Sequence, residues 1–263
     1  MPEVMHAAVD WAAYVAGYHD ANPGITEDVL VDARDNRART PYDWLVQAVP
    51  AGAATVVDLA CGSAPLAPLL AGARVVGVDQ SAAELARARA RTDARPGLLI
   101  RARAGALPIA SQSAEAVVAS MALMLLRPLD AALGEIHRLL RPGGVFVATM
   151  PIRAVSPGPA GTPGFGKILT ALGQTTQRYP EPLDAATAAG RFSAAGLTLS
   201  SDETAVFARA VRGPDDAERV VRSFYAPGAG PDQVADAIAD LQRRVRSAPV
   251  AITYRIRRLV AHR

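Results

Sequence analysis

The stretch Thr55–Leu70 constrains this chain most, because it predicts an apolar strand that runs through a tight turn of small residues into a helix. No bulky side chain stands at residues 60–64, so a ligand can approach the backbone there. The next apolar strand, Arg74–Val78, ends at Asp79. Ligands of open parallel sheets bind at the carboxyl ends of the strands. The turn and Asp79 therefore predict a pocket for a nucleoside with a charged tail.

The composition narrows the class of protein. With 263 residues, 50% of them hydrophobic, the chain can bury the core of one large domain or two small ones. No apolar run reaches the roughly 18 residues of a membrane helix, and the start lacks the basic segment of a signal peptide. The single cysteine, Cys61, excludes an internal disulfide and indicates a reducing compartment, so we expect a cytoplasmic protein with no membrane partner. Four scattered histidines lack metal-ligand spacing, so we expect no metal.

Strands alternate with helices from Thr55 onward, which predicts a parallel sheet with helices on both faces. The expected strands are Thr55–Leu59, Arg74–Val78, Leu98–Arg101, Ala116–Ser120 and Val145–Met150, and the expected helices are Ala82–Arg91 and Leu129–Leu140. A further strand is expected over Leu197–Ala210. The last strand alternates apolar residues with Thr253, Arg255 and Arg257, which is typical of an antiparallel strand with one wet face.

Four segments in this order resemble the class I S-adenosylmethionine-dependent methyltransferases, in particular those that act on small molecules. They read VVDLACGSAP, VVGVDQSAAELARAR, ALPIASQSAEAVVAS and LGEIHRLLRPGGVFVATMP. The resemblance implies an α/β, Rossmann-like, seven-stranded sheet that is mostly parallel with the last strand antiparallel. It also implies one domain over residues 1–263, made of an N-terminal helical cap (1–40), a cofactor-binding core (41–151) and a substrate-side insert with the C-terminal strands (152–263). We expect the N-terminal segment and residues 153–179 to form a mobile helical cap.

The resemblance implies S-adenosylmethionine as the cofactor and assigns residues to it. The methionine end would be held by Asp58, Ala60, Cys61, Gly62 and Ser63. The rest of the cofactor, which comprises the ribose, the adenine and the sulfonium, would contact Asp79, Gln80, Ala104, Gly105, Ser120 and Met121. In relatives the N-terminal segment folds over the pocket, so Tyr18 is expected to touch the cofactor and His19 to act as a base.

Several residues depart from the family pattern, among them the pair Ala114-Glu115 at the start of the fourth strand, where relatives usually have Phe-Asp. Alanines stand at Ala60 and Ala64, where relatives carry glycines, and alanine does not easily adopt a positive φ. Arg103 stands where relatives often have an acid for the adenine amino group, and arginine cannot accept a hydrogen bond. Cys61 is interpreted as a small packing residue of the turn, with a role as nucleophile as the alternative.

The sequence therefore predicts transfer of a methyl group from S-adenosylmethionine to an oxygen, nitrogen or carbon atom of a small molecule such as a secondary metabolite, by a monomer or homodimer. One alternative is an RNA methyltransferase acting on rRNA or tRNA, supported by a C-terminal arginine cluster: Arg243, Arg244, Arg246, Arg255, Arg257, Arg258 and Arg263. Another alternative is a domain that binds the cofactor without methylating, which the two alanines and Arg103 support.

Overall fold

The computed structural model describes residues 9–92, 98–152, 163–174, 179–181, 183–248 and 250–263. They contain a seven-stranded sheet of order β3-β2-β1-β4-β5-β7-β6. The strands are β1 (Thr55–Leu59), β2 (Arg74–Asp79), β3 (Leu98–Arg101), β4 (Ala114–Ser120), β5 (Leu140–Pro151), β6 (Thr198–Val211) and β7 (Val250–His262). β1 to β5 are parallel, and β7 pairs antiparallel with both β5 and β6. The expected fold class, with an antiparallel last strand, is confirmed.

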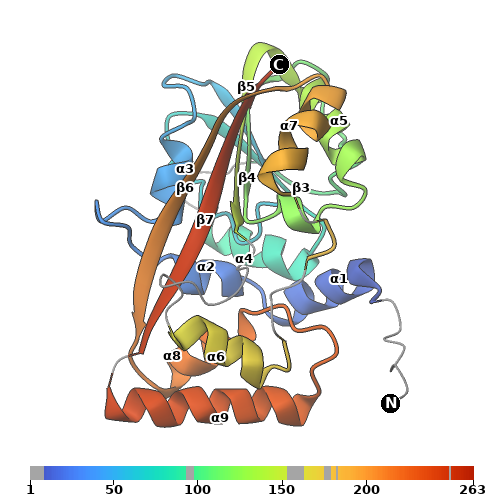
Figure 1. The fold of residues 1–263 in the computed structure, drawn as a ribbon. Helices are drawn as coiled ribbons and strands as arrows, with labels where there is room; N and C mark the ends of the chain where they lie inside the picture. Colours follow the sequence, from blue (N-terminus) through green and yellow to red (C-terminus); the bar gives the residue numbers. More distant parts are fainter. Residues whose placement is uncertain (1–8, 93–97, 153–162, 175–178, 182, 249) are drawn as a thin grey trace.

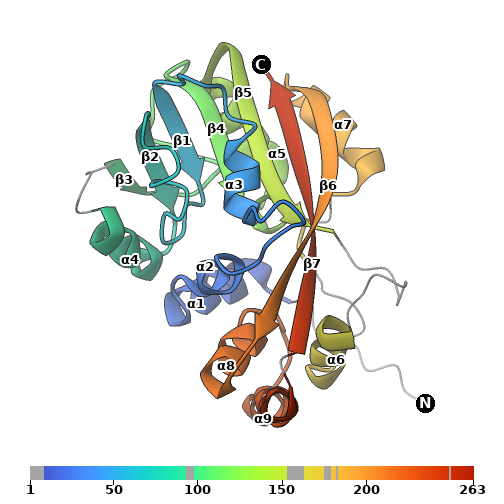
Figure 2. The same cartoon turned by 90° about the vertical axis from the view of Figure 1, so that its left-hand side faces the viewer.

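Helices cover both faces of the sheet (Figures 1 and 2). In chain order they are α1 (Trp11–Ala21), α2 (Ile25–Leu30), α3 (Pro41–Val46), α4 (Ala82–Thr92), α5 (Leu129–Leu139), α6 (Pro163–Ala171), α7 (Ala185–Ala194), α8 (Pro214–Arg222) and α9 (Pro231–Ser247). The central strands are apolar on both sides, because alternate residues enter different cores. Val117 and Phe146 pack in one core with helices α5 and α7, whereas Val118 and Val147 pack in the other with α3.

The first residues of β5, which follows α5 directly, include the Pro142-Gly143-Gly144 segment. The pairing of β4 with β5 shifts register here: Ala114 pairs with Leu140 and Ala116 with Val145, so the residues between them bulge out of the ladder. Gly143 has a φ of 77°, and a Cβ at Gly144 would lie 2.8 Å from a backbone oxygen. Both positions therefore require glycine.

The antiparallel pair of β6 and β7, whose connection contains α8 and α9, extends beyond the rest of the sheet. β5 pairs with β7 only as far as Pro151 opposite Ile256, whereas β6 pairs with β7 as far as Val211 opposite Val250. Helices α6, α8 and α9 gather around this free end, as Figure 2 shows, and form a third core with it. The end of the β6–β7 pair near Val211 and Val250, together with these helices and the segments that join them, is called the C-terminal lobe below. Residues 153–162 and 175–178 of the expected mobile cap lie outside the described residues.

The expectation of one wet face on β7 is wrong at Arg257, which is 6% exposed. Its guanidinium forms a forked ion pair with Asp202 on β6, with Nε 2.6 Å from Oδ1, and donates to the Leu183 carbonyl at 3.0 Å. A planar guanidinium matches a carboxylate through two parallel hydrogen bonds. The pairing allows an arginine to lie under the segment before α7.

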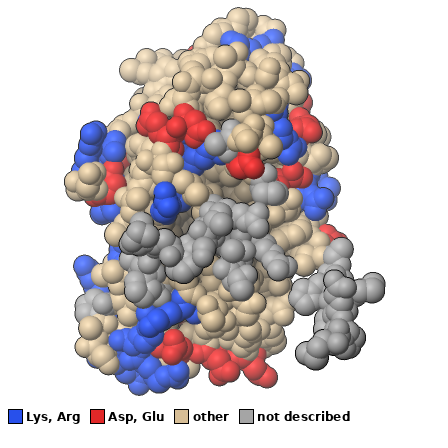
Figure 3. All heavy atoms as spheres, viewed as in Figure 1, with Lys and Arg blue, Asp and Glu red and all other residues tan. Residues whose placement is uncertain are grey.

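The C-terminal arginines do not form one basic surface. Arg258 lies over the Trp44 ring at 4.6 Å and pairs with Glu203, and Arg263 donates to the carbonyls of His137 and Leu140 at the opposite end of β7 from α9. Arg243 pairs with Asp240. Figure 3 shows acidic side chains beside the basic group near the end of α9. The support for an RNA acceptor is therefore lost. Among the described residues no helix is long and apolar enough to cross a membrane.

We expect Arg257→Ala to lower the free energy of unfolding by about 2–3 kcal/mol, because it leaves Asp202 and a buried carbonyl without their partner. Arg222→Ala is the matched control, since the Arg222–Glu218 pair lies on the surface and is worth less than about 0.5 kcal/mol. Urea unfolding of both variants measures the difference. Equal losses would show that the Arg257 pair does not stabilise the fold.

Candidate active site

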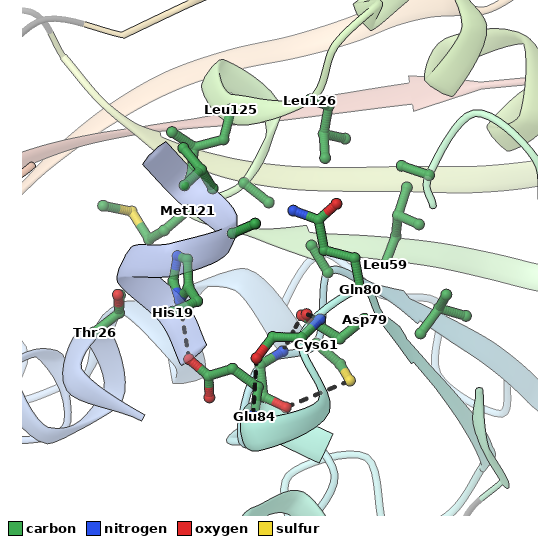
Figure 4. A pocket seen from close by; sticks show the side chains of 18 of the residues that line it. His19, Thr26, Leu59, Cys61, Asp79, Gln80, Glu84, Met121, Leu125 and Leu126 are labelled. Carbon is green, nitrogen blue, oxygen red and sulfur yellow. Dashed lines mark hydrogen bonds and ion pairs between the residues drawn. The ribbon is translucent and has the colours of Figure 1, made fainter. Parts of the chain in front are cut away.

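One pocket lies where the carboxyl ends of β1, β2 and β4 meet α1 and the C-terminal lobe. Its cavity has a volume of about 490 Å³. Figure 4 shows side chains from the strand ends, from α1 and from the β4–α5 segment converging on it. The lining includes every residue expected at the cofactor from the strand ends: Asp58, Ala60, Cys61, Gly62, Ser63, Asp79, Gln80, Ala104, Gly105, Ser120 and Met121. Residues distant in the sequence thus share one cavity.

The turn after β1 has the backbone conformation of glycine at two alanines. Ala60 and Ala64 have φ values of 55° and 58°, close to the 52° of Gly62. The expectation that alanine would resist a positive φ is therefore not met, because the turn is fixed from outside. Cys61 N–H donates to the Val78 carbonyl at 3.0 Å, and Ala64 N–H donates to the Cys61 carbonyl at 2.8 Å.

No helix follows the turn, so that expectation is wrong. Residues 65–70 form successive turns, with Leu70 N–H donating to the Leu66 carbonyl at 3.1 Å. The physical reason is that Pro65 and Pro68 lack the N–H groups that a regular helix would use. Leu66 and Leu70 still pack into the core beside α3.

Asp58 ends in the pocket with an unpaired oxygen. The residue is 1% exposed, and its Oδ2 atom has no hydrogen-bond partner among the described residues. Burial, with a smaller contribution from the nearby Asp79 carboxylate, raises the pKa of Asp58 from 3.8 to about 8. A buried carboxyl of this kind is unfavourable unless a donor or a cation satisfies it.

Asp79 fixes the pocket floor while keeping acceptor capacity. Its Oδ2 atom accepts the Gly62 N–H at 2.9 Å and its Oδ1 atom accepts the Ser81 N–H at 2.9 Å. Burial raises the pKa of Asp79, and these two backbone hydrogen bonds act in the opposite direction. A carboxylate has about four lone-pair sites, so each oxygen can accept one further hydroxyl.

Cys61 is a packing residue. It is 4% exposed, burial raises the pKa of its thiol well above the ordinary value, and its sulfur lies 3.0 Å from where a Cβ on Gly77 would stand. A buried thiol with a raised pKa is a poor nucleophile at neutral pH. The alternative role as nucleophile is therefore not supported.

Helix α1 divides its side chains between the pocket and the C-terminal lobe. Trp11, Val15 and His19 line the pocket, as spacing along a helix allows. Tyr18 does not belong to the described lining, and its hydroxyl donates to the Arg222 carbonyl at 2.6 Å. The contact of Tyr18 with the cofactor stays a prediction, because the Tyr18 side chain points toward α8 in this structure.

Sequence reasoning missed several lining residues. Two are acidic, Glu27 on α2 and Glu84 on α4, and both are buried. Ser63 donates to the Glu27 carboxylate, which ties α2 to the turn after β1. Tyr225, just after α8, enters from the C-terminal lobe. No local motif marks these residues, because only the packing of α1, α2 and the lobe on the strand ends brings them to the cavity.

Comparison with known proteins agrees with this geometry. Residues 57–148 match the methyltransferase domain family. A 2-phytyl-1,4-naphtoquinone methyltransferase of Thermosynechococcus vestitus is 41% identical over 39% of this chain and 47% of its own, and a trans-aconitate 2-methyltransferase of Paracidovorax citrulli is 32% identical over 51% of each. The chain spans about half the length of these curated relatives. The crystal structure of the [4+2]-cyclase SpnF has the same fold, with a TM-score of 0.62, 19% identity, and coverage of 95% of this chain and 94% of that one.

The strand order, the small-residue turn after β1 and the acid at the end of β2 define the class I methyltransferase fold. The match over residues 57–148 places a methyltransferase domain in the core of this chain.

The strained alanine in the turn gives a stability test. We expect Ala64→Gly to cost at least about 1 kcal/mol less than Ala188→Gly, a buried alanine of α7. Both variants lose a methyl group and gain chain entropy when unfolded, but only at Ala64 does glycine relieve a left-handed conformation. Thermal or urea unfolding compares the two. A similar cost at both positions would mean that the turn stores no strain at Ala64.

Proposed function

We propose that this protein transfers a methyl group from S-adenosylmethionine to a small-molecule acceptor. The observation that carries the proposal is the unpaired, buried Oδ2 atom of Asp58 in the pocket wall. The ammonium group of the cofactor's methionine end would supply the missing donor and cation. Release of S-adenosylhomocysteine when the protein meets the cofactor and a panel of quinols, phenols and carboxylic acids tests the activity.

The charges around the cofactor end favour a cationic ligand. Glu27, Asp79 and Glu84 line the cavity and are largely buried, and Asp58 adds a further negative charge once it is ionised. Opposite charges attract more strongly where protein replaces water. The bound cofactor supplies an activated methyl group on a cationic sulfur. A nucleotide whose phosphates carry negative charge would meet these carboxylates with repulsion.

The remaining cofactor roles follow from position. Asp79 would accept the two ribose hydroxyls with its free lone pairs, and Gln80 would lie beside the adenine. Ala104 and Gly105 would border the adenine through their backbones, since small residues allow close approach. Arg103 lines the same part of the pocket and has no acceptor, so adenine recognition there would fall to backbone groups. The three-part division at residues 40 and 151 is likewise a proposal.

The acceptor side of the pocket is apolar. Its walls include Trp11, Val15, Met121, Leu125 and Leu126, from α1 and the segment after β4. These walls would align an apolar acceptor with the methyl group and exclude water from it. They fit a quinone-like or aromatic molecule better than a polyanion. The two relatives are named for a naphthoquinone and for trans-aconitate, a tricarboxylate, and this lining favours the former kind of acceptor.

We expect Asp79→Ala to weaken S-adenosylhomocysteine binding at least tenfold, which is about 1.4 kcal/mol. The variant removes the ribose acceptors and frees the Gly62 N–H. Asp215→Ala, an exposed acid in the first turn of α8, is the matched control and should bind normally. Titration calorimetry compares them. Unchanged affinity in Asp79→Ala would remove this residue from the cofactor site.

The raised pKa of Asp58 makes cofactor binding depend on pH. Between pH 6 and about pH 8 the free protein keeps Asp58 largely protonated, whereas an ammonium ligand needs the carboxylate. We therefore expect affinity for S-adenosylhomocysteine to rise with pH by up to tenfold per unit and to level off near pH 8, with a proton released on binding. Calorimetry in buffers of different ionisation enthalpy measures both effects.

Asp58→Asn should make the affinity weaker and its pH profile flat over the same range. Folding stability depends on pH in the opposite direction to ligand affinity. A folded-state pKa above the unfolded value makes ionisation destabilising, so the contribution of Asp58 to stability falls as pH rises from about 4 to 8. A wild-type affinity that does not change with pH would show that Asp58 does not meet a cation.

A further inference from the structure

A chain of hydrogen bonds runs along the pocket wall from Glu84 through His19 to Tyr225. His19 Nδ1 lies 2.9 Å from Glu84 Oε1, and His19 Nε2 lies 2.9 Å from the Tyr225 hydroxyl. The three residues come from α4, α1 and the segment after α8, and all of them line the cavity. Figure 4 shows His19 above Glu84, with Met121 and Gln80 on the other walls of the same space.

The donor and the acceptor of each hydrogen bond in this series can be assigned. The Glu84 carboxylate is almost fully buried, with a side-chain exposure of 4%, and its Oε2 atom accepts the Gly24 N–H at 2.8 Å. A carboxylate only accepts, so the proton between Glu84 and His19 belongs to Nδ1. In the neutral ring Nε2 is then an acceptor, and the Tyr225 O–H donates to it. Burial raises the pKa of Tyr225, which keeps the phenol protonated and able to donate.

The Tyr225 oxygen keeps acceptor capacity beyond its hydrogen bond to His19, because a phenol oxygen both donates and accepts. Tyr225 and Thr26 both line the pocket. The Tyr225 oxygen can therefore receive a proton from a hydroxyl in the cavity as its own proton moves to Nε2. Tyr14, whose hydroxyl accepts the Ala226 N–H at 2.8 Å, belongs to the same aromatic group but is not part of the described lining.

We propose that Glu84, His19 and Tyr225 form a proton relay that activates an acceptor hydroxyl, so that the acceptor is an apolar phenol, enol or alcohol. Tyr225 is the catalytic residue that touches the acceptor, His19 receives the proton, and Glu84 is a positioning residue. The inference rests on the proposed methyl transfer and adds the acceptor class. It also explains why a buried carboxylate, a histidine and a phenol are hydrogen-bonded in series in the pocket wall, since an acceptor that is already anionic would need no proton acceptor.

The step balances as follows. The acceptor oxygen gives its proton to Tyr225 while the Tyr225 proton passes to His19 Nε2. The electron pair left on the acceptor, on oxygen or on a conjugated carbon, forms the bond to the methyl carbon. The bond from that carbon to sulfur breaks, and its electron pair stays on sulfur. The imidazolium is stabilised by Glu84 and later returns its proton to water through Tyr225.

The relay is tested with acceptors of different acidity. With naphthols and hydroquinones, whose pKa is about 10 like that of tyrosine, we expect Tyr225→Phe to lower kcat by about 10²-fold and Glu84→Gln by about tenfold, with KM little changed. With a nitrophenol that is ionised at the assay pH, the same variants should lose less than about threefold. Tyr14→Phe, which removes the same atom from the neighbouring ring, should behave as wild type with both acceptors.

A structural role for these residues predicts a different result, because a loosened pocket would reduce transfer to both kinds of phenol equally. That outcome, or transfer confined to carboxylates, thiols and amines, would overturn the relay. No transfer to any hydroxyl compound would overturn it as well. Calorimetric titration with S-adenosylhomocysteine separates the two proposals: normal binding leaves the proposed methyltransferase in place, and absent binding removes both.

Discussion

The hydrogen bond from the Gly62 N–H to the Asp79 carboxylate is the contact on which the pocket depends. It joins the turn after β1 to the end of β2, and so fixes two neighbouring strand ends with respect to each other. Parallel pairing alone places these ends at the same edge of the sheet. The hydrogen bond then sets the path of the turn, and the buried Asp58 Oδ2 atom beside it accepts no hydrogen bond from the part of the chain that the structure describes. This contact thus forms the floor of the pocket and keeps the buried Asp58 oxygen beside it, where a cation could bind.

The same contact explains how alanine can occupy a glycine position. A left-handed alanine costs about 1–2 kcal/mol, so it persists only where the surroundings determine the backbone. Here the turn is held by hydrogen bonds to Val78 and Asp79 and by Ser63 against Glu27. Ala60 and Ala64 therefore do not indicate a damaged cofactor site. The non-methylating alternative loses the support that it drew from these two residues.

The sheet, and the meeting of the residues expected at the cofactor in one cavity, could be predicted because their signals are local. Each strand is a short apolar run, and most of these residues lie at or just after a strand end. Their binding of the cofactor stays a prediction. Errors arise where a distant partner decides. The alternating pattern predicts an exposed Arg257, but its ion pair with Asp202 on the neighbouring strand β6 allows Arg257 to be buried. Tyr18 and His19 are neighbours in sequence, and only the docking of α1 between α8 and α4 decides which of them enters the pocket.

The side of the pocket proposed for the acceptor could not be predicted, because residues from distant parts of the chain form it. This difference between the two sides of the pocket also matters for the chemistry. The strand ends carry the groups that we propose for the cofactor, whereas α1 and the C-terminal lobe carry those that we propose for the acceptor. His19 is the point where the two halves meet, since its ring bonds a core carboxylate on one side and a lobe phenol on the other. Glu84 already faces the cofactor end through Gly62, so an acceptor proton would move toward buried negative charge. That direction of movement leaves the acceptor electron-rich where the cationic sulfur is expected, which links the choice of acceptor to the charge of the cofactor.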